Sequence, residues 1–356
     1  MISVTGKFNQ ILKKVYFILK LRKPFLVLKM LMLTIRTLLY KQRPPFRQIE
    51  IQSTLACNLR CTHCSAKNFE INDEMLSFED YKKISKQAKY HDSPMLSFTG
   101  GEPLLDPRLE DIIRLFDTRS MLVSITTNGT LLTFERARRL KLIGVDGFMI
   151  SLDGSNSQAN DMIRGDGVFE SVINAIQIAK GLGFFVMIIH TLTHLSIKNN
   201  NFNGILNLAQ KLDIPLHVSL VSPVGNLANM DLLDDYILSN EDILYLEDCQ
   251  KKYPFLRRDL DGNYFQRGCP AGVERFVISP YGDVMPCTKI QASFGNIKDE
   301  PMIDIRNRMI NTKIFDNYPL LCLAAEDDNF LNVYMPRTFN RKDLPIDYND
   351  YFKGSL

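Results

Sequence analysis

Short apolar runs alternate with longer amphipathic stretches from Gln48 to Val221. The runs have the length of strands and lie at Ile49–Leu55, Met95–Thr99, Leu122–Thr126, Gly147–Leu152, Phe184–Thr191 and Leu216–Val221. Between them, apolar residues recur at helical spacing, for example in Leu109–Phe116, Phe134–Leu142, Phe169–Lys180 and Ile205–Leu212. Strands that alternate with helices predict βαβ units and a parallel sheet. Six such units predict an α/β fold, a partial (β/α)6 barrel, with its chemistry at the carboxyl ends of the strands.

The chain begins with a basic arm, residues 1–46. Apolar residues recur at helical spacing from Ile11 to Leu19, Pro24 breaks this pattern, and a second helix is expected before Pro44 and Pro45. Residues 1–49 contain eleven Lys and Arg and no acid, although the whole chain carries only +3. The arm either lies on an anionic membrane surface or packs its apolar side on the body of the protein. Aromatic residues are sparse among the lysines, so nucleic-acid binding is not expected.

Composition places the protein among globular chains, with 45% hydrophobic and 23% charged residues. The apolar stretch Phe25–Tyr40 is interrupted by Lys29 and Arg36, which argues against a membrane-spanning helix. No secretory signal is expected. We therefore expect a cytoplasmic protein, whose arm could bring it to the inner face of the membrane.

The seven cysteines are odd in number and too few for a disulfide scaffold, and three of them fall within eight positions. These three are Cys57, Cys61 and Cys64, directly after the first predicted strand. Fe–S clusters commonly take four cysteines, so three thiolates would leave one iron open to another ligand, such as the amino and carboxylate groups of a methionine moiety. Structural zinc is the alternative, but zinc sites want four protein ligands and His63 would be poorly aimed as a fourth. Unrelated buried thiols are the third interpretation.

The CxxxCxxC loop resembles the signature of the radical S-adenosylmethionine (SAM) superfamily, and further segments resemble that family in the same order. After the second strand, Gly100, Gly101, Glu102 and Pro103 look like the family's GGEP element, which holds the SAM amino group. Glycines let backbone approach a ligand closely, and a carboxylate accepts from an ammonium group. A plain turn is the other interpretation.

The resemblance implies further SAM contacts at the ends of the third and fourth strands and just beyond. Asn128 and Asp153 lie at such ends, where they could equally cap the next helix, and Ser151 looks like a ribose contact. Arg164, in a segment similar to D-x-[IL]-R-G, would pair with the SAM carboxylate. The radical SAM core would span residues 47–225, with weaker adenine contacts expected from Ser219–Gly225.

Residues 226–356 hold the other four cysteines and would form a second, smaller domain. Cys269 and Cys287 enclose Gly282 in a C-x12-G-x4-C pattern that resembles the auxiliary-cluster region called SPASM, or its shorter twitch form. The later dense run of four cysteines is missing, so at most one auxiliary 4Fe–4S cluster is expected, on Cys269, Cys287 and Cys322. Its fourth ligand could be Cys249, Glu326, Asp327 or no side chain. Structural thiols are the other interpretation.

The resemblance implies reductive cleavage of SAM at the first 4Fe–4S cluster to a 5′-deoxyadenosyl radical, which takes a hydrogen atom from the substrate. A low-potential donor such as flavodoxin or ferredoxin would supply the electron. The resemblance implies an oxidoreductase or a peptide-modifying enzyme, and a ribosomally made peptide is the first expected substrate. The alternatives are radical dehydrogenation of a small molecule (a sugar, aminocyclitol or membrane-associated substrate) and a non-catalytic Fe–S sensor. No acid–base residue can be chosen, since His190 and His194, near the end of the fifth strand, could be structural.

Overall fold

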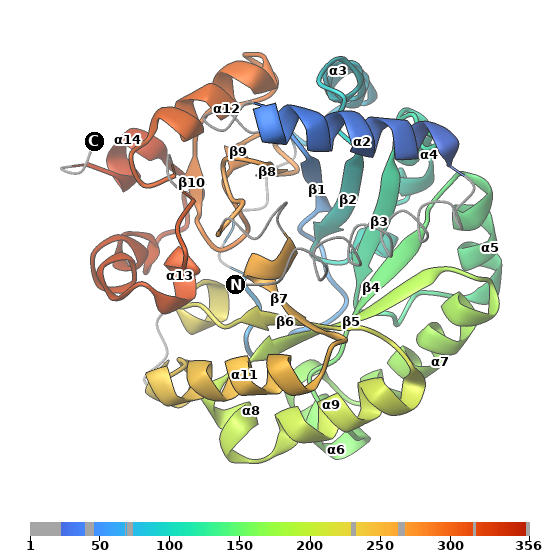
Figure 1. The fold of residues 1–356 in the computed structure, drawn as a ribbon, viewed down its shortest axis with the longest axis vertical. Coiled ribbons are helices and arrows are strands. Elements are labelled where there is room, and N and C mark those ends of the chain that lie inside the picture. Colours follow the sequence, from blue (N-terminus) through green and yellow to red (C-terminus); the bar gives the residue numbers. More distant parts are fainter. Residues whose placement is uncertain are drawn as a thin grey trace.

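A computed structural model describes residues 23–39, 46–67, 69, 74–228, 233–262, 268–315 and 318–353. Its main sheet has nine strands in the order β7-β6-β5-β4-β3-β2-β1-β8-β9. All neighbouring strands in it are parallel except β8 and β9. Figure 1 shows the sheet curling round the centre of the molecule, with helices outside it. This is the expected α/β partial barrel.

Six strands coincide closely with the predicted ones: β1 (Gln48–Thr54), β2 (Met95–Gly100), β3 (Leu122–Thr127), β4 (Gly147–Ser151), β5 (Phe185–Leu192) and β6 (Leu216–Leu220). The helices that follow them are α3 (Phe78–Tyr90), α4 (Leu109–Arg114), α5 (Phe134–Leu142), α6 (Ser157–Arg164), α7 (Val168–Gly181), α8 (His194–Lys198) and α9 (Asn201–Leu212). Caps define several of these helices, as when Thr133 Oγ1 accepts from the Arg136 N–H at the start of α5.

The strands carry two different faces because side chains alternate along them. Toward the helices they present fully buried apolar residues such as Ile49, Ile51 and Phe98. The opposite face is polar: Gln48 Nε2 donates to Ser97 Oγ at 3.0 Å, and Ser97 Oγ lies 3.0 Å from Ser124 Oγ. The inside of the barrel, here called the lumen, is therefore suited to polar groups.

The second half of the chain extends this sheet at both ends. β7 (Leu256–Arg258) pairs with β6, and β8 (Arg275–Ile278) pairs in parallel with β1. β9 (Val284–Met285) then pairs with β8, while β10 (Ala292–Ser293) and β11 (Ile346–Asp347) form a separate two-stranded sheet. The six-strand prediction missed β7 and β8, because runs of three and four residues carry little periodicity. Pairing with β8 covers an edge of β1 that would otherwise expose its backbone groups.

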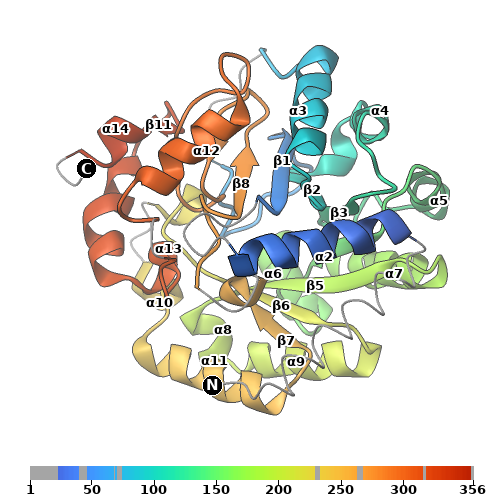
Figure 2. The same ribbon diagram turned by 45° about the horizontal axis from the view of Figure 1, so that its top comes forward.

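The other helices of the second half are α10 (Leu233–Tyr236), α11 (Asn240–Lys252), α12 (Met302–Asn311), α13 (Leu323–Glu326) and α14 (Tyr348–Tyr351). Figure 2 shows α12, α13 and α14 grouped on the side of β8, away from α5 and α7. An aromatic cluster holds this group together, including Phe294, Phe315 and Phe352, which are fully buried. The second half thus packs beside the barrel and also contributes to its sheet.

The basic arm is represented by α2 (Pro24–Leu39), the second of its two predicted helices. The Lys23 ammonium anchors it by donating to the carbonyls of Met121 (2.9 Å) and Gly144 (3.2 Å) and by pairing with Asp146. These partners precede β3 and β4, so α2 lies at the amino ends of the strands. The helix predicted over residues 11–19 and the Pro44-Pro45 end of the arm lie outside the described residues. No helix in the described part is long and apolar enough to cross a membrane.

Candidate functional site

The first cysteine triad, Cys57, Cys61 and Cys64, lies on the loop that leaves the carboxyl end of β1. Cys57 is exposed, and the other two are half-buried. Burial raises the pKa of the Cys57 thiol, and the nearby Glu102 carboxylate and Cys64 raise it further. Burial likewise raises the pKa of Cys61, against the Arg164 guanidinium, which lowers it. Binding of Cys57 and Cys61 to a cationic iron core would offset this rise in their pKa and favour the thiolate.

The loop that carries these thiols is fixed from three sides. The N–H groups of Gly101 and Glu102 donate to the carbonyls of Thr54 and Ala56, both at 2.8 Å. From the far side of the barrel, Asn226 donates its backbone N–H to Cys64 O (3.0 Å) and its Nδ2 to Cys61 O (2.8 Å). The second half of the chain adds a bond from Gln291 Nε2 to Ser65 O at 3.1 Å.

Glycine is required where these segments touch. A Cβ on Gly101 would lie 2.3 Å from Ala56 O, and one on Gly225, whose φ is +59°, would lie 2.0 Å from Cys64 O. We expected the two glycines of the GGEP element to admit a ligand. In the structure, Gly101 fits against the backbone of Leu55 and Ala56, and Gly100 against that of Thr54 at the end of β1. A contact of these glycines with a ligand stays a prediction.

Glu102 is fully buried and joins the ends of two strands. Its carboxylate accepts from Thr127 Oγ1 (2.7 Å), from the Asn128 N–H (2.7 Å) and from the Leu104 N–H (3.0 Å). Burial raises the pKa of Glu102, while these hydrogen bonds lower it. If the SAM amino group contacts Glu102, it would therefore meet a carboxylate that these hydrogen bonds already hold in place. Pro103, next to it, begins the short helix Pro103–Leu105.

Asp153 is the centre of a buried ionic cluster that sequence reasoning missed. Its Oδ2 lies 2.6 Å from Arg164 Nη2 and 3.2 Å from His63 Nε2. Its Oδ1 accepts from the Thr191 N–H at 2.8 Å and lies 3.2 Å from His190 Nδ1. Burial would raise the pKa of Asp153, but Arg164 and His63 hold it well below its usual range. Arg164 Nη1 also reaches Cys61 Sγ at 3.8 Å, so the cluster connects to the cysteine loop.

The alternation of buried and half-buried side chains along β5 could have indicated that His190 is a partner of Asp153. His190 lies on β5, and β4 pairs with β5 so that Ser151 stands opposite Ile189. A residue just past the end of β4 can therefore reach His190. His194 is placed differently, because its Nδ1 lies 2.8 Å from Asp242 on α11.

The polar residues at the ends of β3 and β4 have different surroundings. Asn128 Nδ2 donates to Asn58 Oδ1 at 2.9 Å and lies 3.9 Å from Cys57 Sγ, so Asn128 borders the first triad. Ser151, at the end of β4, is half-buried. Asp153 and Asn128 therefore both contact residues of the site that are distant in sequence.

Several buried polar atoms at this end of the barrel make no hydrogen bond within the described part of the chain. They include Arg164 Nε, Gln52 Oε1 near the end of β1, and Ser222 Oγ after β6. Buried polar groups in folded proteins are almost always paired. Together with three thiols and a guanidinium, these orphaned atoms fit a ligand as polar as SAM beside an Fe–S cluster.

The lumen below this site holds charges of both signs, which sequence reasoning also missed. Asp259 Oδ1 lies 3.1 Å from His217 Nε2 of β6, and its Oδ2 pairs with Lys289 Nζ. Burial would raise the pKa of Asp259, but Lys289 and His217 hold it below its usual range. Burial raises the pKa of Glu50, on β1, whereas the facing Arg275 of β8 lowers it.

The second triad, Cys269, Cys287 and Cys322, comes together next to Arg275 and Lys289. Burial raises the pKa of Cys269 to about 11, with the neighbouring Cys287 thiol adding to the rise. Burial also raises the pKa of Cys322, against the Lys289 ammonium, which lowers it. Thiolate ligands of a cluster would be stabilised by both cations.

The candidate fourth ligands of this triad have other partners. Cys249 is buried on α11, where its thiol contacts Tyr245. Glu326 accepts from the Cys322 N–H at 2.8 Å and pairs with Arg258 at 3.3 Å. Asp327 accepts from the Phe330 N–H at 2.7 Å.

Neither triad resembles a site for one ion. Among the described residues, no three His, Cys, Asp or Glu side chains converge tightly enough to hold a single metal ion. In a 4Fe–4S cluster each thiolate binds a different iron, so its ligands stand farther apart than those of one ion.

Comparison with known proteins agrees with this geometry. Residues 51–212 match the profile of the radical SAM superfamily, and residues 269–324 match that of the SPASM iron–sulfur cluster-binding domain. An AdoMet-dependent heme synthase of Nitratidesulfovibrio vulgaris is 26% identical over 294 residues, 74% of this chain and 79% of that protein. A probable GTP 3′,8-cyclase of Saccharolobus islandicus is 28% identical over 306 residues, 80% of this chain and 96% of that protein.

Solved structures share the fold. The structure of Streptococcus suis SuiB bound to the precursor peptide SuiA superposes with a TM-score of 0.57 at 17% identity. The match covers 81% of this chain and 68% of SuiB.

Proposed function

Because the chain belongs to the radical SAM superfamily and carries a SPASM iron–sulfur region, we propose that it takes a hydrogen atom from a peptide held in the lumen of its barrel. When bound, the first 4Fe–4S cluster and SAM supply reductive cleavage of the C5′–S bond, which yields methionine and the radical that removes the hydrogen. Cys57, Cys61 and Cys64 would hold that cluster. Gln52, Ser151, Arg164 and Ser222 would contact SAM.

The observation that carries this proposal is the placement of two cysteine triads at different levels of β1. The first triad follows Thr54, where β1 ends. The second lies next to Arg275, which pairs with Gln48, where β1 begins. Glu50 and the Asp259 cluster lie in the lumen at the level of Arg275. A substrate in the lumen would therefore contact charged groups while lying near both clusters.

The residues of the lumen would bind and orient the substrate. Asp259 and Glu50 can accept hydrogen bonds, and Arg275, Lys289 and His217 can donate them. The peptide backbone offers both donors and acceptors, so it matches such a lining. Arg275 and Lys289 also place positive charge beside the second triad, which favours an added electron on a cluster held there. We propose three cysteine ligands for that cluster, because Cys249, Glu326 and Asp327 have other partners.

A second candidate function is radical chemistry on a carboxylate-bearing small molecule. The similarity in sequence to a heme synthase and to an Fe-coproporphyrin III synthase of Methanosarcina barkeri, the latter 30% identical over 186 residues, favours it. Arg275 and Lys289 could pair with substrate carboxylates. In both proposals a flavodoxin or a ferredoxin would supply the electron for SAM cleavage.

The test is an anaerobic assay of the reconstituted protein with SAM, dithionite and one substrate class at a time. The probes are short synthetic peptides of varied sequence and iron coproporphyrin III. The peptide proposal predicts that a peptide increases 5′-deoxyadenosine formation and yields a peptide of changed mass. Turnover of the porphyrin with unchanged peptides would contradict it and favour the second candidate.

A further inference from the structure

Helix α2 presents an apolar face that the described part of the chain does not cover. Phe25, Leu28, Met32, Ile35 and Leu39 recur at spacings of three and four residues, and each is 42–72% exposed. Spacings of three and four put these side chains along one side of a helix. Leu31, on the same helix, is also more than half exposed. A stripe of this length is larger than the scattered single apolar residues of ordinary surfaces.

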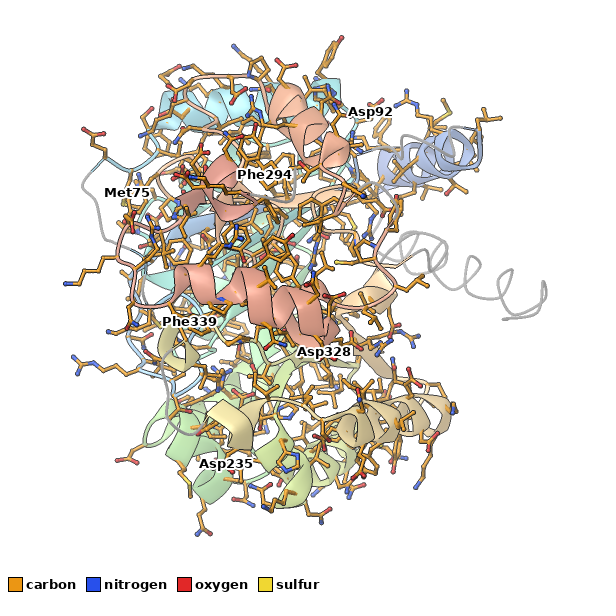
Figure 3. The ribbon with its side chains drawn as sticks, turned by 90° about the vertical axis from the view of Figure 1, so that its left-hand side faces the viewer. Met75, Asp92, Asp235, Phe294, Asp328 and Phe339 are labelled. Carbon is orange, nitrogen blue, oxygen red and sulfur yellow. The ribbon has the colours of Figure 1, made fainter. Side chains whose placement is uncertain are left out.

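Other side chains of α2 fix the helix to the body. Leu26 and Leu33 are buried, Lys29 Nζ donates to Ser120 Oγ at 3.2 Å, and Arg36 Nη1 pairs with Asp92 at 3.1 Å. Figure 3 shows α2 projecting from the edge of the body near Asp92. Because these contacts and the Lys23 anchor hold the helix, its apolar stripe is a fixed feature of the surface.

Positive charge accompanies the stripe. A groove of about 530 Å³ runs along α2, lined by Phe25, Leu28 and Met32 on one side and by Lys89 and Arg119 on the other. The acids of the groove have partners: Asp92 pairs with Arg36, and Asp117 accepts from Ser120. In the sequence, the segments before and after α2, residues 1–22 and 40–45, contain no acid and seven more Lys and Arg, namely Lys7, Lys13, Lys14, Lys20, Arg22, Lys41 and Arg43.

We propose that the α2 face binds an anionic lipid surface, with its apolar stripe inserted among the acyl chains and its cations at the headgroups. Apolar residues flanked by Lys and Arg are the combination that holds an interfacial helix at a charged bilayer. The position of α2 is compatible with catalysis, because it lies at the amino ends of the strands. The cysteine loop leaves the carboxyl end of β1, so the site would face away from the membrane.

The test is sedimentation of the full-length protein with vesicles of phosphatidylcholine alone and of phosphatidylcholine mixed with phosphatidylglycerol. The wild type should bind the mixed vesicles roughly tenfold or more tightly than the neutral ones, and high salt should weaken this binding. The variant Leu28→Gln/Met32→Gln/Ile35→Gln should lose at least roughly tenfold in binding to the mixed vesicles, because three apolar side chains no longer leave water.

The matched control replaces three exposed leucines elsewhere, Leu142→Gln/Leu244→Gln/Leu320→Gln, and should bind the vesicles like the wild type. All changed side chains are exposed, so both variants should fold, as circular dichroism can check. Equal vesicle binding by the wild type and the α2 variant would overturn the proposal. So would a wild-type dimer, seen by light scattering, that binds no vesicles and dissociates in the α2 variant, since the stripe would then join two copies.

Discussion

At the residue scale, Asp153 links Arg164, which we propose contacts SAM, to His63 of the cysteine loop. Replacing it with asparagine removes a buried negative charge and leaves Arg164 without its partner. Loss of one member of a buried ion pair costs roughly 3–5 kcal/mol, so Asp153→Asn should lower the free energy of unfolding of the cluster-free protein by about that amount. Urea denaturation measures it.

The exposed pair of Asp111 and Arg114 provides the control for that experiment, since both side chains are more than half exposed. Asp111→Asn should cost less than about 1 kcal/mol. Equal costs for the two variants would mean that the Asp153 cluster is not the buried network described above.

Asp259 allows a test of the lumen that is separate from SAM binding. Asp259→Asn removes the charge that pairs with Lys289 and His217 inside the lumen. We expect substrate-dependent product to fall by at least roughly tenfold, the cost of leaving buried donors unpaired. Cleavage of SAM without substrate should continue at the wild-type rate. If mass spectrometry shows that both reactions fall together, Asp259 acts on the SAM site or on folding.

At the element scale, β1 and β2 place the cysteine loop only if their ends pack closely. Gly101→Ala would put a methyl group 2.3 Å from Ala56 O, so the loop must shift. The iron content after reconstitution should fall by roughly half or more. Gly181→Ala, at the end of α7 with open space around it, should leave the iron content unchanged. A full iron content in both variants would refute the packing argument.

The elements themselves were largely predictable from the sequence. β1–β6 and the helices between them show clear periods of two and 3.6, and the predicted boundaries agree with the observed ones to within a few residues. β7 and β8 escaped prediction because each is short and becomes a strand through pairing with β6 or β1. The contacts of His63 with Asp153 and of Arg275 with Glu50 were not predicted either, since each joins residues far apart in sequence. The second depends on the pairing of β8 with β1.

The parts of the candidate site that could be predicted best are those whose residues lie close together in the sequence. The CxxxCxxC loop and Gly100–Pro103 could be found in the sequence because their geometry depends on neighbours in the chain. The contact of Arg164 with the SAM carboxylate stays a prediction, whereas its ion pair with Asp153 was not predicted. No local sequence pattern predicts this ion pair, because it depends on where β4 and α6 place the two side chains.

At the scale of the whole molecule, the two triads should be separable. Cys322→Ala removes one ligand from the second triad and leaves the first intact. The wild type should hold about eight irons, and the variant about four. The variant should still cleave SAM but yield little modified substrate. Iron analysis together with mass spectrometry of the product checks both statements. About four irons per chain in the fully reconstituted wild type would contradict the second cluster.

The central claim is that the loop after β1 holds the cluster at which SAM is cleaved. The most direct test measures 5′-deoxyadenosine by mass spectrometry, after anaerobic incubation of the reconstituted protein with SAM and dithionite, for the wild type beside Cys57→Ala. We predict 5′-deoxyadenosine from the wild type and none above background from the variant. A wild type that is fully loaded with iron yet makes no 5′-deoxyadenosine, or a variant that makes as much as the wild type, would contradict the claim.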